Sequence, residues 1–562
     1  MPYDLDQLKA PRSMGGLLRL FVKVAESRLL GGAVAKKFLR DVGITALRTL
    51  PADDPPWEAF TGFPVVEPVE GPVTSDLSRV GPGPAEGKAG FPFETSAAYV
   101  TAYREKRLDP VVVAERVLAW SKDSDALEPP MRVFIAQDAD DVLAQARASA
   151  ERYEAGKPLG PLDGVPIAVK DELDQRGYPR TVGTRFLGAA SCANDAEAVA
   201  RLRATGAVLI GKANMHEIGM GVTGINPHHG PARNPYDPAR CTGGSSSGPA
   251  AAVAAGLCPV ALGADGGGSI RIPAALCGLV GLKPTFGRVS EHGAAPLCWS
   301  VAHIGPLAAS VRDAALVWLA ISGPDPHDPH TLRQPAIRID GWDTPDLRGV
   351  RLGICTPWFE HADEGVVAAC RKTLDGLCEA GAQVVEVDVP ELNLLRSVHM
   401  LTIASEMQAS QMLDLATHRK LYGHDIRLNL AVTNHARSGD YVHAQRHRTR
   451  LCRQFAEILA RVDALVYPSS AVTAPPLPDG ALRTGISDLA LGDAIMRNSL
   501  PANVTGLPAI GFPAGYDSAG LPVGFQVMGR AWDERLLLHI AAVAERFVKR
   551  TKPLIHRQIV QG

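Results

Sequence analysis

Short apolar runs alternate with longer amphipathic stretches along most of the chain. The short runs are rich in Val, Ile, Leu and Ala, which is typical of strands buried within a sheet. The stretches between them carry apolar residues three and four positions apart, as a helix with one buried face does. This alternation predicts an α/β fold in which helices cover both faces of a β-sheet. The predicted strands are residues 165–170, 207–211, 260–263, 350–354, 383–387 and 464–467.

Helical periodicity is clearest in residues 96–103, 111–120 and 139–154. Residues 241–264 form the longest uncharged run, which is long enough to suggest a membrane span. Because Pro249, Pro259 and several Gly and Ser residues interrupt this run, we expect a buried helix followed by a buried strand. The sequence therefore predicts no transmembrane helix.

The first fifty residues differ in composition from the rest. Between Arg12 and Arg48, eight basic and two acidic residues are interleaved with Leu and Phe. This predicts a pair of basic amphipathic helices, with Gly31 and Gly32 as the break between them. Such a pair either docks at a membrane interface, with Lys and Arg at the headgroups, or packs as a hairpin on the main domain or on a second subunit. The pattern alone slightly favours packing.

Three parts are expected along the chain. Residues 1–50 form the basic helical extension, a candidate membrane or substrate-entry cap. Residues 51–95 are rich in Pro, Gly and acidic residues, which is typical of an extended linker. Residues 96–555 carry the α/β pattern and form the expected catalytic domain, which is long enough for a deep core.

Charge and cysteine content exclude several classes of function. The 58 Lys and Arg residues nearly balance the 60 Asp and Glu residues, so no overall basic excess attracts nucleic acid. Nine cysteines without a C-x-x-C pair argue against a disulfide framework and a zinc site, and favour a reducing, cytoplasmic compartment. The N-terminus does not read as a secretory signal, because charged residues interrupt its apolar region. His228, His229 and His303 lack a carboxylate at ligand spacing, so no metal site is predicted.

Two clusters rich in glycine and serine carry the candidate chemistry. Residues 242–248 read Thr-Gly-Gly-Ser-Ser-Ser-Gly, and residues 264–271 read Ala-Asp-Gly-Gly-Gly-Ser-Ile-Arg. Dense glycines let the backbone turn sharply and bring consecutive N–H groups close to a ligand. In the second cluster three glycines lead directly into Ser269, a candidate nucleophile.

Lys170 ends an apolar run, which indicates that its amine is buried. Burial disfavours the charged ammonium, so a buried lysine can accept a proton. With Ser245 and Ser269 downstream, Lys170 fits a Ser–Lys arrangement, one of the convergent substitutes for a Ser-His-Asp triad. Each residue alone is more often a surface lysine or an ordinary turn, but their order and spacing together favour a catalytic set.

Two further motifs match known sites less well. Residues 244–248 also fit a G-x-S-x-G nucleophile elbow centred on Ser246, but the residues before them make a poor strand. Residues 206–213 nearly match a phosphate-binding loop, but their inner residues form a predicted strand and Ala213 lacks the required hydroxyl. Neither function is expected.

Together these segments resemble the amidase signature family of serine hydrolases. The resemblance rests on Lys170, on the serines around Ser245, on the run that ends at Arg271, and on C-terminal motifs at residues 503–509 and 520–529. It covers about residues 96–552. Most members of the family have Gly where this chain has Ser247. The resemblance implies the amidase signature α/β/α fold, in which helices cover both faces of a large mixed β-sheet, with an N-terminal helical extension. It also implies a reaction without a cofactor.

The resemblance also implies a role for each residue of the clusters. Lys170 takes a proton from Ser245, and Ser245 takes the proton of Ser269, which attacks the amide carbonyl. Backbone N–H groups of the second cluster hold the oxyanion, a contact commonly worth about 2.7–4 kcal/mol per donor. The catalytic residues are then Lys170, Ser245 and Ser269; the oxyanion hole and acyl site comprise Gly219, Gly266, Gly267, Gly268 and Ser269; and Ser246, Asp265 and Arg271 support them, the last two as an ion pair.

The flanking segments are similar to the plant-type fatty acid amide hydrolases, which share the triple serine and basic N-terminal helices. These segments are residues 8–11, 20–22, 211–221, 233–238 and 244–248. In that group the N-terminal helices shape a membrane-facing entrance to an acyl channel, which favours lipid entry for residues 12–48. The implied activity is hydrolysis of lipophilic amides, such as N-acylethanolamines, by a cytoplasmic homodimer that associates peripherally with membranes.

Two alternatives retain this fold. One is an amidase with another substrate range. The other is the A-type subunit of a glutamine-dependent amidotransferase, which shares the Ser-Ser-Lys machinery but works with partner chains. The basic amphipathic N-terminus and the plant-type motifs argue against the second.

Overall fold

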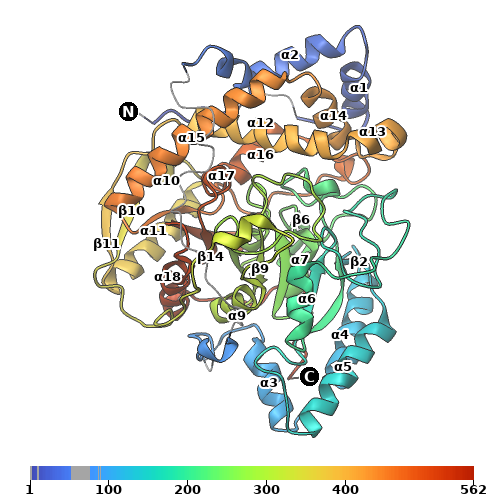
Figure 1. The fold of residues 1–562 in the computed structure, drawn as a ribbon, viewed down its shortest axis with the longest axis vertical. Helices are drawn as coiled ribbons and strands as arrows, with labels where there is room; N and C mark the ends of the chain where they lie inside the picture. Colours follow the sequence, from blue (N-terminus) through green and yellow to red (C-terminus); the bar gives the residue numbers. More distant parts are fainter. Residues whose placement is uncertain (1–2, 9–11, 52–75, 87, 89, 562) are drawn as a thin grey trace.

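A mixed sheet of eleven strands forms the centre of the protein (Figure 1). The computed structural model describes residues 3–8, 12–51, 76–86, 88 and 90–561, so most of the predicted linker lies outside the described residues. The strand order is β11 (Gln383–Glu386), β10 (Arg351–Ile354), β12 (Ala464–Pro468), β15 (Pro522–Gly529), β14 (Ala509–Tyr516), β8 (Val280–Lys283), β9 (Ile304–Ala308), β7 (Val260–Ala264), β3 (Pro166–Lys170), β4 (Val208–Ala213) and β2 (Phe134–Ala136).

All six predicted strands are present, and their ends differ from the prediction by at most two residues. β3 pairs in parallel with β4 and β7, and β10 pairs in parallel with β11 and β12, whereas the central strands are antiparallel. Five strands of this sheet were not predicted: β2, β8, β9, β14 and β15. Glycine and proline interrupt the apolar pattern in several of them, as in Gly305 and Pro306 of β9.

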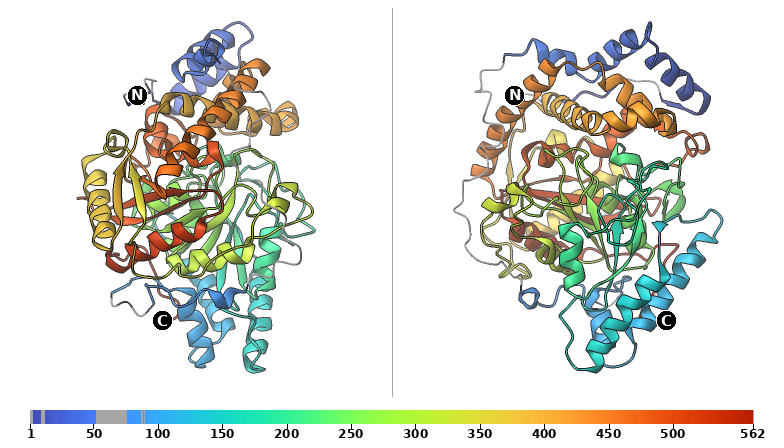
Figure 2. Two further views of the ribbon diagram at one scale, coloured as in Figure 1. Left: turned by 60° about the vertical axis from the view of Figure 1, so that its left-hand side comes forward. Right: turned by 45° about the vertical axis from the view of Figure 1, so that its right-hand side comes forward.

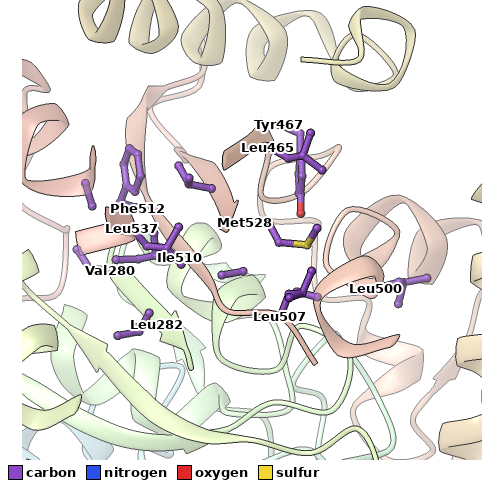
Figure 3. Close-up of a cluster of buried hydrophobic side chains, with 14 of the residues drawn as sticks. Val280, Leu282, Leu465, Tyr467, Leu500, Leu507, Ile510, Phe512, Met528 and Leu537 are labelled. Atoms are coloured by element: carbon purple, nitrogen blue, oxygen red, sulfur yellow. The ribbon is translucent and has the colours of Figure 1, made fainter. Parts of the chain in front are cut away.

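Alternate residues of the strands face two separate cores. Ile167 and Val169 of β3 belong to one core, whereas Ala168 between them belongs to the other. Helices α6, α9, α11 and α18 contribute to the first core, and α3, α4, α5 and α7 contribute to the second. Leu282, Ile510 and Leu537 lie in the first core, between the sheet and α18 (Figure 3). The sheet is therefore buried on both faces, as its continuous apolar strands require.

The helices surround the sheet in three groups. Those that cover its faces are α3 (Ser96–Arg104), α4 (Pro110–Asp125), α5 (Ala139–Glu154), α6 (Glu197–Ala204), α7 (Ser247–Ala254), α9 (Val311–Ile321), α11 (Glu364–Glu379) and α18 (Glu534–Phe547). A group of shorter helices comprises α8 (Arg271–Leu276), α10 (Thr356–Phe359), α16 (Leu489–Met496) and α17 (Leu500–Thr505). A cap is built from α12 (Leu392–Ser410), α13 (Met412–His418), α14 (His424–Thr433) and α15 (Ser438–Arg461).

The N-terminal extension packs on this cap as two helices, α1 (Gly15–Ala25) and α2 (Gly31–Asp41) (Figure 2). Glu26 forms ion pairs with Arg419 (3.0 Å) and Arg427 (2.7 Å), and thereby fixes the end of α1. The predicted break at Gly31 is misplaced, because residues 26–30 form the turn and Gly31 begins α2. A Cβ on Gly31 would lie 2.4 Å from the carbonyl oxygen of Ala25, so glycine permits this close approach.

Two short strand pairs complete the fold. β1 (Ser13–Met14) pairs with β13 (Ile486–Ser487), which ties the beginning of the extension to the segment before α16. β5 (Arg233–Asn234) pairs with β6 (Asp237–Cys241), and β6 leads into the first glycine–serine cluster.

Glu545 on α18 offers a test of this packing, because its side chain is buried and accepts a hydrogen bond from the N–H of Val311 (2.9 Å). Burial raises the pKa of Glu545 from 4.5 to about 7. Between pH 4.5 and about 7, Glu545 is protonated in the native protein but ionised in the unfolded chain. The free energy of unfolding therefore falls as the pH rises through this range. Glu545→Gln should remove this loss, which amounts to at most about 3 kcal/mol. Denaturant melts at several pH values measure it; identical pH dependence in both proteins would contradict the assignment.

Candidate active site

The second glycine–serine cluster forms a tight turn between β7 and α8. At its start, the carboxylate of Asp265 accepts hydrogen bonds from the N–H groups of Gly268 (2.7 Å) and Ile270 (3.2 Å). Gly268 has a φ of +113°, and a Cβ there would lie 2.5 Å from Cδ1 of Ile272. Glycine is therefore required at this position, and the turn holds Ser269 in a fixed, largely buried place.

A buried ion pair holds this turn against the C-terminal part of the chain. The guanidinium of Arg271 binds both carboxylate oxygens of Asp265, each at 3.0 Å. It also donates to the side chains of Asn503 (2.6 Å) and Gln526 (3.0 Å). Burial by itself would raise the pKa of Asp265, but Arg271, together with Lys283 and Asn503, holds it well below its usual value. Asp265 is thus an anion near pH 7.

The first cluster lies directly against the second. The peptide bond between Gly244 and Ser245 is cis. The N–H of His216 donates to the carbonyl oxygen of Ser245 (3.1 Å), and the N–H of Ser246 donates to that of Ser269 (3.3 Å). The second bond joins the two serine-rich turns, and the first attaches the cis-peptide turn to the segment after β4.

Lys170 lies at the end of β3 and is almost fully buried. Its Nζ donates to Oγ of Ser245 (2.8 Å) and to the carbonyl oxygen of Ala264 (3.2 Å). Ser246 donates its hydroxyl to the same carbonyl (3.3 Å). The structure thus places Lys170 against Ser245, and Ser269 is linked to them through the main-chain hydrogen bond of the neighbouring Ser246.

Glu172 is a contact of Lys170 that sequence reasoning missed. Its Oε2 lies 2.6 Å from Nζ of Lys170, and both side chains are buried. The two residues are only two positions apart, but spacing alone does not reveal whether the chain after β3 continues straight or turns back. It turns, because the N–H of Leu173 donates to the carbonyl oxygen of Lys170 (3.1 Å).

Three of the four N–H groups expected to face an oxyanion are available. Among the described residues, no hydrogen bond within the protein involves the N–H of Gly266, Gly267 or Ser269. The expectation for Gly268 is wrong, because its N–H donates to Asp265. This hydrogen bond helps to shape the turn. Because it occupies the N–H of Gly268, that group does not bind a substrate oxygen.

His399 on α12 supports the turn from the other side. Its Nε2 lies 2.8 Å from the carbonyl oxygen of Gly266. Burial lowers the pKa of His399 to about 4, so the ring is neutral near pH 7 and Nε2–H is the donor. No local motif marks this histidine, which is 133 positions from its partner.

A cavity of about 220 Å³ opens beside Ser269. Its wall is largely apolar and includes Gly219. A Cβ on Gly219 would lie 3.6 Å from Oγ of Ser245, so this glycine lies close to the first serine cluster. Phe38 of α2 also reaches this cavity, so the N-terminal extension takes part in its wall. The other apolar residues of the wall include Met220, Val222, Met400, Ile403, Met407, Leu489, Leu491 and Met496.

Two polar residues of the cavity wall were not predicted. Nε2 of His216 lies 3.6 Å from Oδ2 of Asp425, and both side chains are buried. They come from segments more than two hundred residues apart, so no sequence pattern joins them.

The histidines that suggested a metal take other partners. His228 lies 2.7 Å from Glu217, and His229 contacts the carbonyl oxygen of Thr184 (3.0 Å). Within the described residues there is no group of three or more His, Cys, Asp or Glu side chains arranged for a metal ion. In the same part of the chain, no helix is both long and apolar enough to span a bilayer.

Comparison with known proteins assigns the family. Residues 115–538 match the family model described as Amidase. The chain belongs to the amidase family. It is also 38% identical over 578 residues to a fatty acid amide hydrolase of Medicago truncatula, an alignment that covers 98% of this amidase and 95% of the relative.

Two more distant relatives share the same core. The A-type subunit of a glutamyl-tRNA(Gln) amidotransferase from Chloroflexus aggregans is 37% identical, over 80% of this chain and 96% of its own length. The solved structure of the native peptide amidase from Stenotrophomonas maltophilia superposes with a TM-score of 0.71 at 30% identity, over 82% of this chain and 98% of that one. These comparisons confirm the predicted amidase signature α/β fold, and this protein is an amidase.

The fit between Gly266 and Cys298 gives a test of the turn. A Cβ on Gly266 would lie 2.7 Å from Sγ of Cys298. Gly266→Ala should therefore displace the turn and lower kcat by about 10- to 100-fold. Adding Cys298→Ala removes the clashing sulfur and should restore most of the rate. Gly439→Ala is the matched control, because a Cβ there meets nothing within 4 Å. Unchanged kcat in Gly266→Ala would contradict this packing.

Proposed function

We propose that this amidase hydrolyses lipophilic amides, such as N-acylethanolamines and other fatty acid amides, to a carboxylate and an amine. The observation that carries the proposal is the apolar cavity, which opens beside Ser269 and is partly walled by Phe38 of the N-terminal extension. The similarity to the Medicago protein covers this extension as well as the catalytic part of the chain, whereas the similarity to the Chloroflexus amidotransferase covers 80% of the chain.

The reaction begins with attack of Ser269 on the amide carbonyl. Ser245 takes the proton of Ser269, and the hydrogen bond from Lys170 to Ser245 (2.8 Å) supports a relay through the lysine. The same path returns a proton to the leaving amine, and water then hydrolyses the acyl-enzyme by the reverse steps. Ser246 supports this arrangement through the carbonyl of Ala264, which it shares with Lys170.

The oxyanion of the tetrahedral intermediate lies against the N–H groups of Gly266, Gly267 and Ser269. Because the bonds of Asp265 and His399 hold this turn in place, the donors do not need to reorganise when charge develops. Gly219 lies on the acyl side of the cavity, where the absence of a side chain leaves room beside Ser245.

The extension serves lipid entry at a membrane surface. One face of α1 and α2 is packed, while Leu17 and Leu20 of α1 and Leu29 and Leu30 of the turn between the helices are 48% to 92% exposed. Arg19, Lys23, Lys36 and Lys37 are exposed on the same two helices, as expected for contact with anionic headgroups. We place the protein at the cytoplasmic side of such a membrane. We also expect it to be a homodimer, and light scattering of the purified protein tests this oligomeric state.

The triad is tested by substitution. Ser269→Ala should abolish hydrolysis of an N-acyl amine, and Lys170→Ala should nearly do so, because each removes a link of the proton path. Ser121→Ala is a matched control, since Ser121 is buried on α4 and binds Gln137 there. Initial rates and active-site titration measure the effect. Near-normal turnover by Ser269→Ala, or turnover of glutamine only with a partner chain, would refute the proposal.

Lipid entry is tested at the exposed leucines. Leu29→Glu with Leu30→Glu should weaken binding to anionic vesicles and lower kcat/KM for long acyl chains more than for short ones. Leu554→Glu is the control, because Leu554 is 76% exposed and only eight residues before the C-terminus. The C-terminus lies at the opposite end of the molecule from α1 and α2 (Figure 1). Vesicle flotation and rates across a series of acyl lengths measure both effects. Equal losses on short and long chains would count against lipid entry.

A further inference from the structure

A row of polar residues interrupts the apolar wall of the cavity beside Ser269. Asp425, Asn429 and Thr433 of α14 line the cavity, and their spacing of four residues places them on one face of that helix. His216, from the segment after β4, lines the same cavity. Sites for small molecules commonly combine an apolar wall with a few polar groups that fix the orientation of the ligand. We therefore expect a polar part of the substrate on this side.

His216 and Asp425 both have unused hydrogen-bonding capacity. Oδ1 of Asp425 accepts from the N–H of Ile426 (2.9 Å). Oδ2 of Asp425 and Nδ1 of His216 are buried and have no hydrogen-bond partner among the described residues. Nε2 of His216 lies 3.6 Å from Oδ2 of Asp425, which is beyond hydrogen-bond distance. Because most buried polar atoms in native proteins are paired, this carboxylate and imidazole in a cavity wall point to a ligand that both of them bind.

The two residues lie on the catalytic side of the cavity. The N–H of His216 donates to the carbonyl oxygen of Ser245 (3.1 Å), and the N–H of Gly219 donates to that of His216 (2.9 Å). A Cβ on Gly221 would lie 2.2 Å from Nε2 of His216, so the main chain packs directly against this ring. Apolar side chains of α12 and α16 line the same cavity. The cavity thus offers polar contacts near the serines and an apolar surface for a chain.

We propose that Asp425, with His216 beside it, binds a hydroxyl group on the leaving amine of the substrate. The carboxylate of Asp425 accepts the hydrogen of this hydroxyl, and a ring N–H of His216 donates to its oxygen. The acyl chain lies against α12 and α16. This inference rests on the proposed hydrolysis of lipophilic amides, because it assigns the amine part of the same substrate.

The two residues thereby select amides whose amine carries a hydrogen-bond donor. A propyl group has the size of a hydroxyethyl group but leaves the carboxylate and the imidazole unpaired. A methoxyethyl group has an oxygen but no hydrogen to donate. A site that hydrogen-bonds a substrate hydroxyl discriminates strongly against an analogue without it, whereas a purely apolar pocket discriminates only weakly. The preference for a donor therefore reports whether these residues contact the amine.

The experiment compares kcat/KM for four dodecanoyl amides that form two size-matched pairs. The amine parts are hydroxyethyl and propyl in one pair, and methoxyethyl and butyl in the other. The wild type should favour hydroxyethyl over propyl at least about tenfold, because a hydrogen bond to a charged group is lost with propyl. It should cleave the methoxyethyl and butyl amides at similar rates, because neither amine donates a hydrogen to Asp425.

Asp425→Asn should move both ratios. The N–H of Ile426 keeps the amide oxygen of the new side chain at the position of Oδ1, so that its NH₂ group replaces Oδ2. The preference for hydroxyethyl should then fall at least about threefold, and a preference for methoxyethyl over butyl should appear, because the NH₂ group donates to the ether oxygen. His216→Leu removes both ring nitrogens and should lower the hydroxyethyl preference without creating a methoxyethyl preference.

Equal changes for all four amides in Asp425→Asn would overturn the proposal, because a purely structural role predicts that result. Unchanged ratios would overturn it as well. If Asp425→Asn fails to fold, the wild-type series decides: equal kcat/KM for the hydroxyethyl and propyl amides contradicts recognition of a donor. Asp414→Asn is the matched control, since Asp414 lies on α13, outside the cavity wall, and all four rates should stay unchanged.

The same series separates this inference from the proposed function. If the wild type hydrolyses none of the four amides, hydrolysis of lipophilic amides itself is refuted. Hydrolysis without a preference for the hydroxyethyl amide refutes only the roles of Asp425 and His216.

Discussion

The buried ion pair between Asp265 and Arg271 is the interaction on which the active site depends. Each partner is fully buried, and a lone charge in that position would be strongly destabilising. The pair is stable because the other hydrogen-bonding groups of the two side chains also have partners. Asp265 accepts hydrogen bonds from N–H groups of its own turn, and Arg271 donates to Asn503 and Gln526. One interaction thereby closes the turn of Ser269 and attaches it to α17 and β15, more than two hundred residues further along the chain.

The sheet explains why the base and the nucleophile turn meet. β3 and β7 are adjacent and parallel, so Lys170 at the end of one strand and Ala264 at the end of the other emerge at the same edge. β4 is parallel to β3 and ends at Ala213, which delivers residues 214–219 to that edge as well. Ligand sites of open α/β sheets form at the carboxyl ends of parallel strands for this reason. The apolar strands thus position the chemistry and contribute to it only at their last residues, the amine of Lys170 and the carbonyl of Ala264.

The cap adds what the sheet cannot provide, namely an apolar wall over the nucleophile. α12 contributes both His399, which supports the turn, and Ile403 and Met407, which line the cavity. The N-terminal extension packs on this cap and contributes Phe38. Packing and lipid entry, which the sequence presented as alternative roles for the extension, are therefore compatible, because its inner face packs while leucines and basic residues remain exposed.

The sequence by itself determined the fold class, six strands, the serine clusters and Lys170, since periodicity and glycine-rich turns are local properties of a chain. It missed strands such as β9, in which glycine and proline mask the apolar pattern, and it assigned Gly268 to the oxyanion. Only the tertiary structure decided that Gly268 binds Asp265, that His399 supports Gly266, and that Glu172 turns back onto Lys170. These contacts depend on how the backbone turns and on which distant helix covers it, and neither the spacing nor the types of the residues specify that geometry.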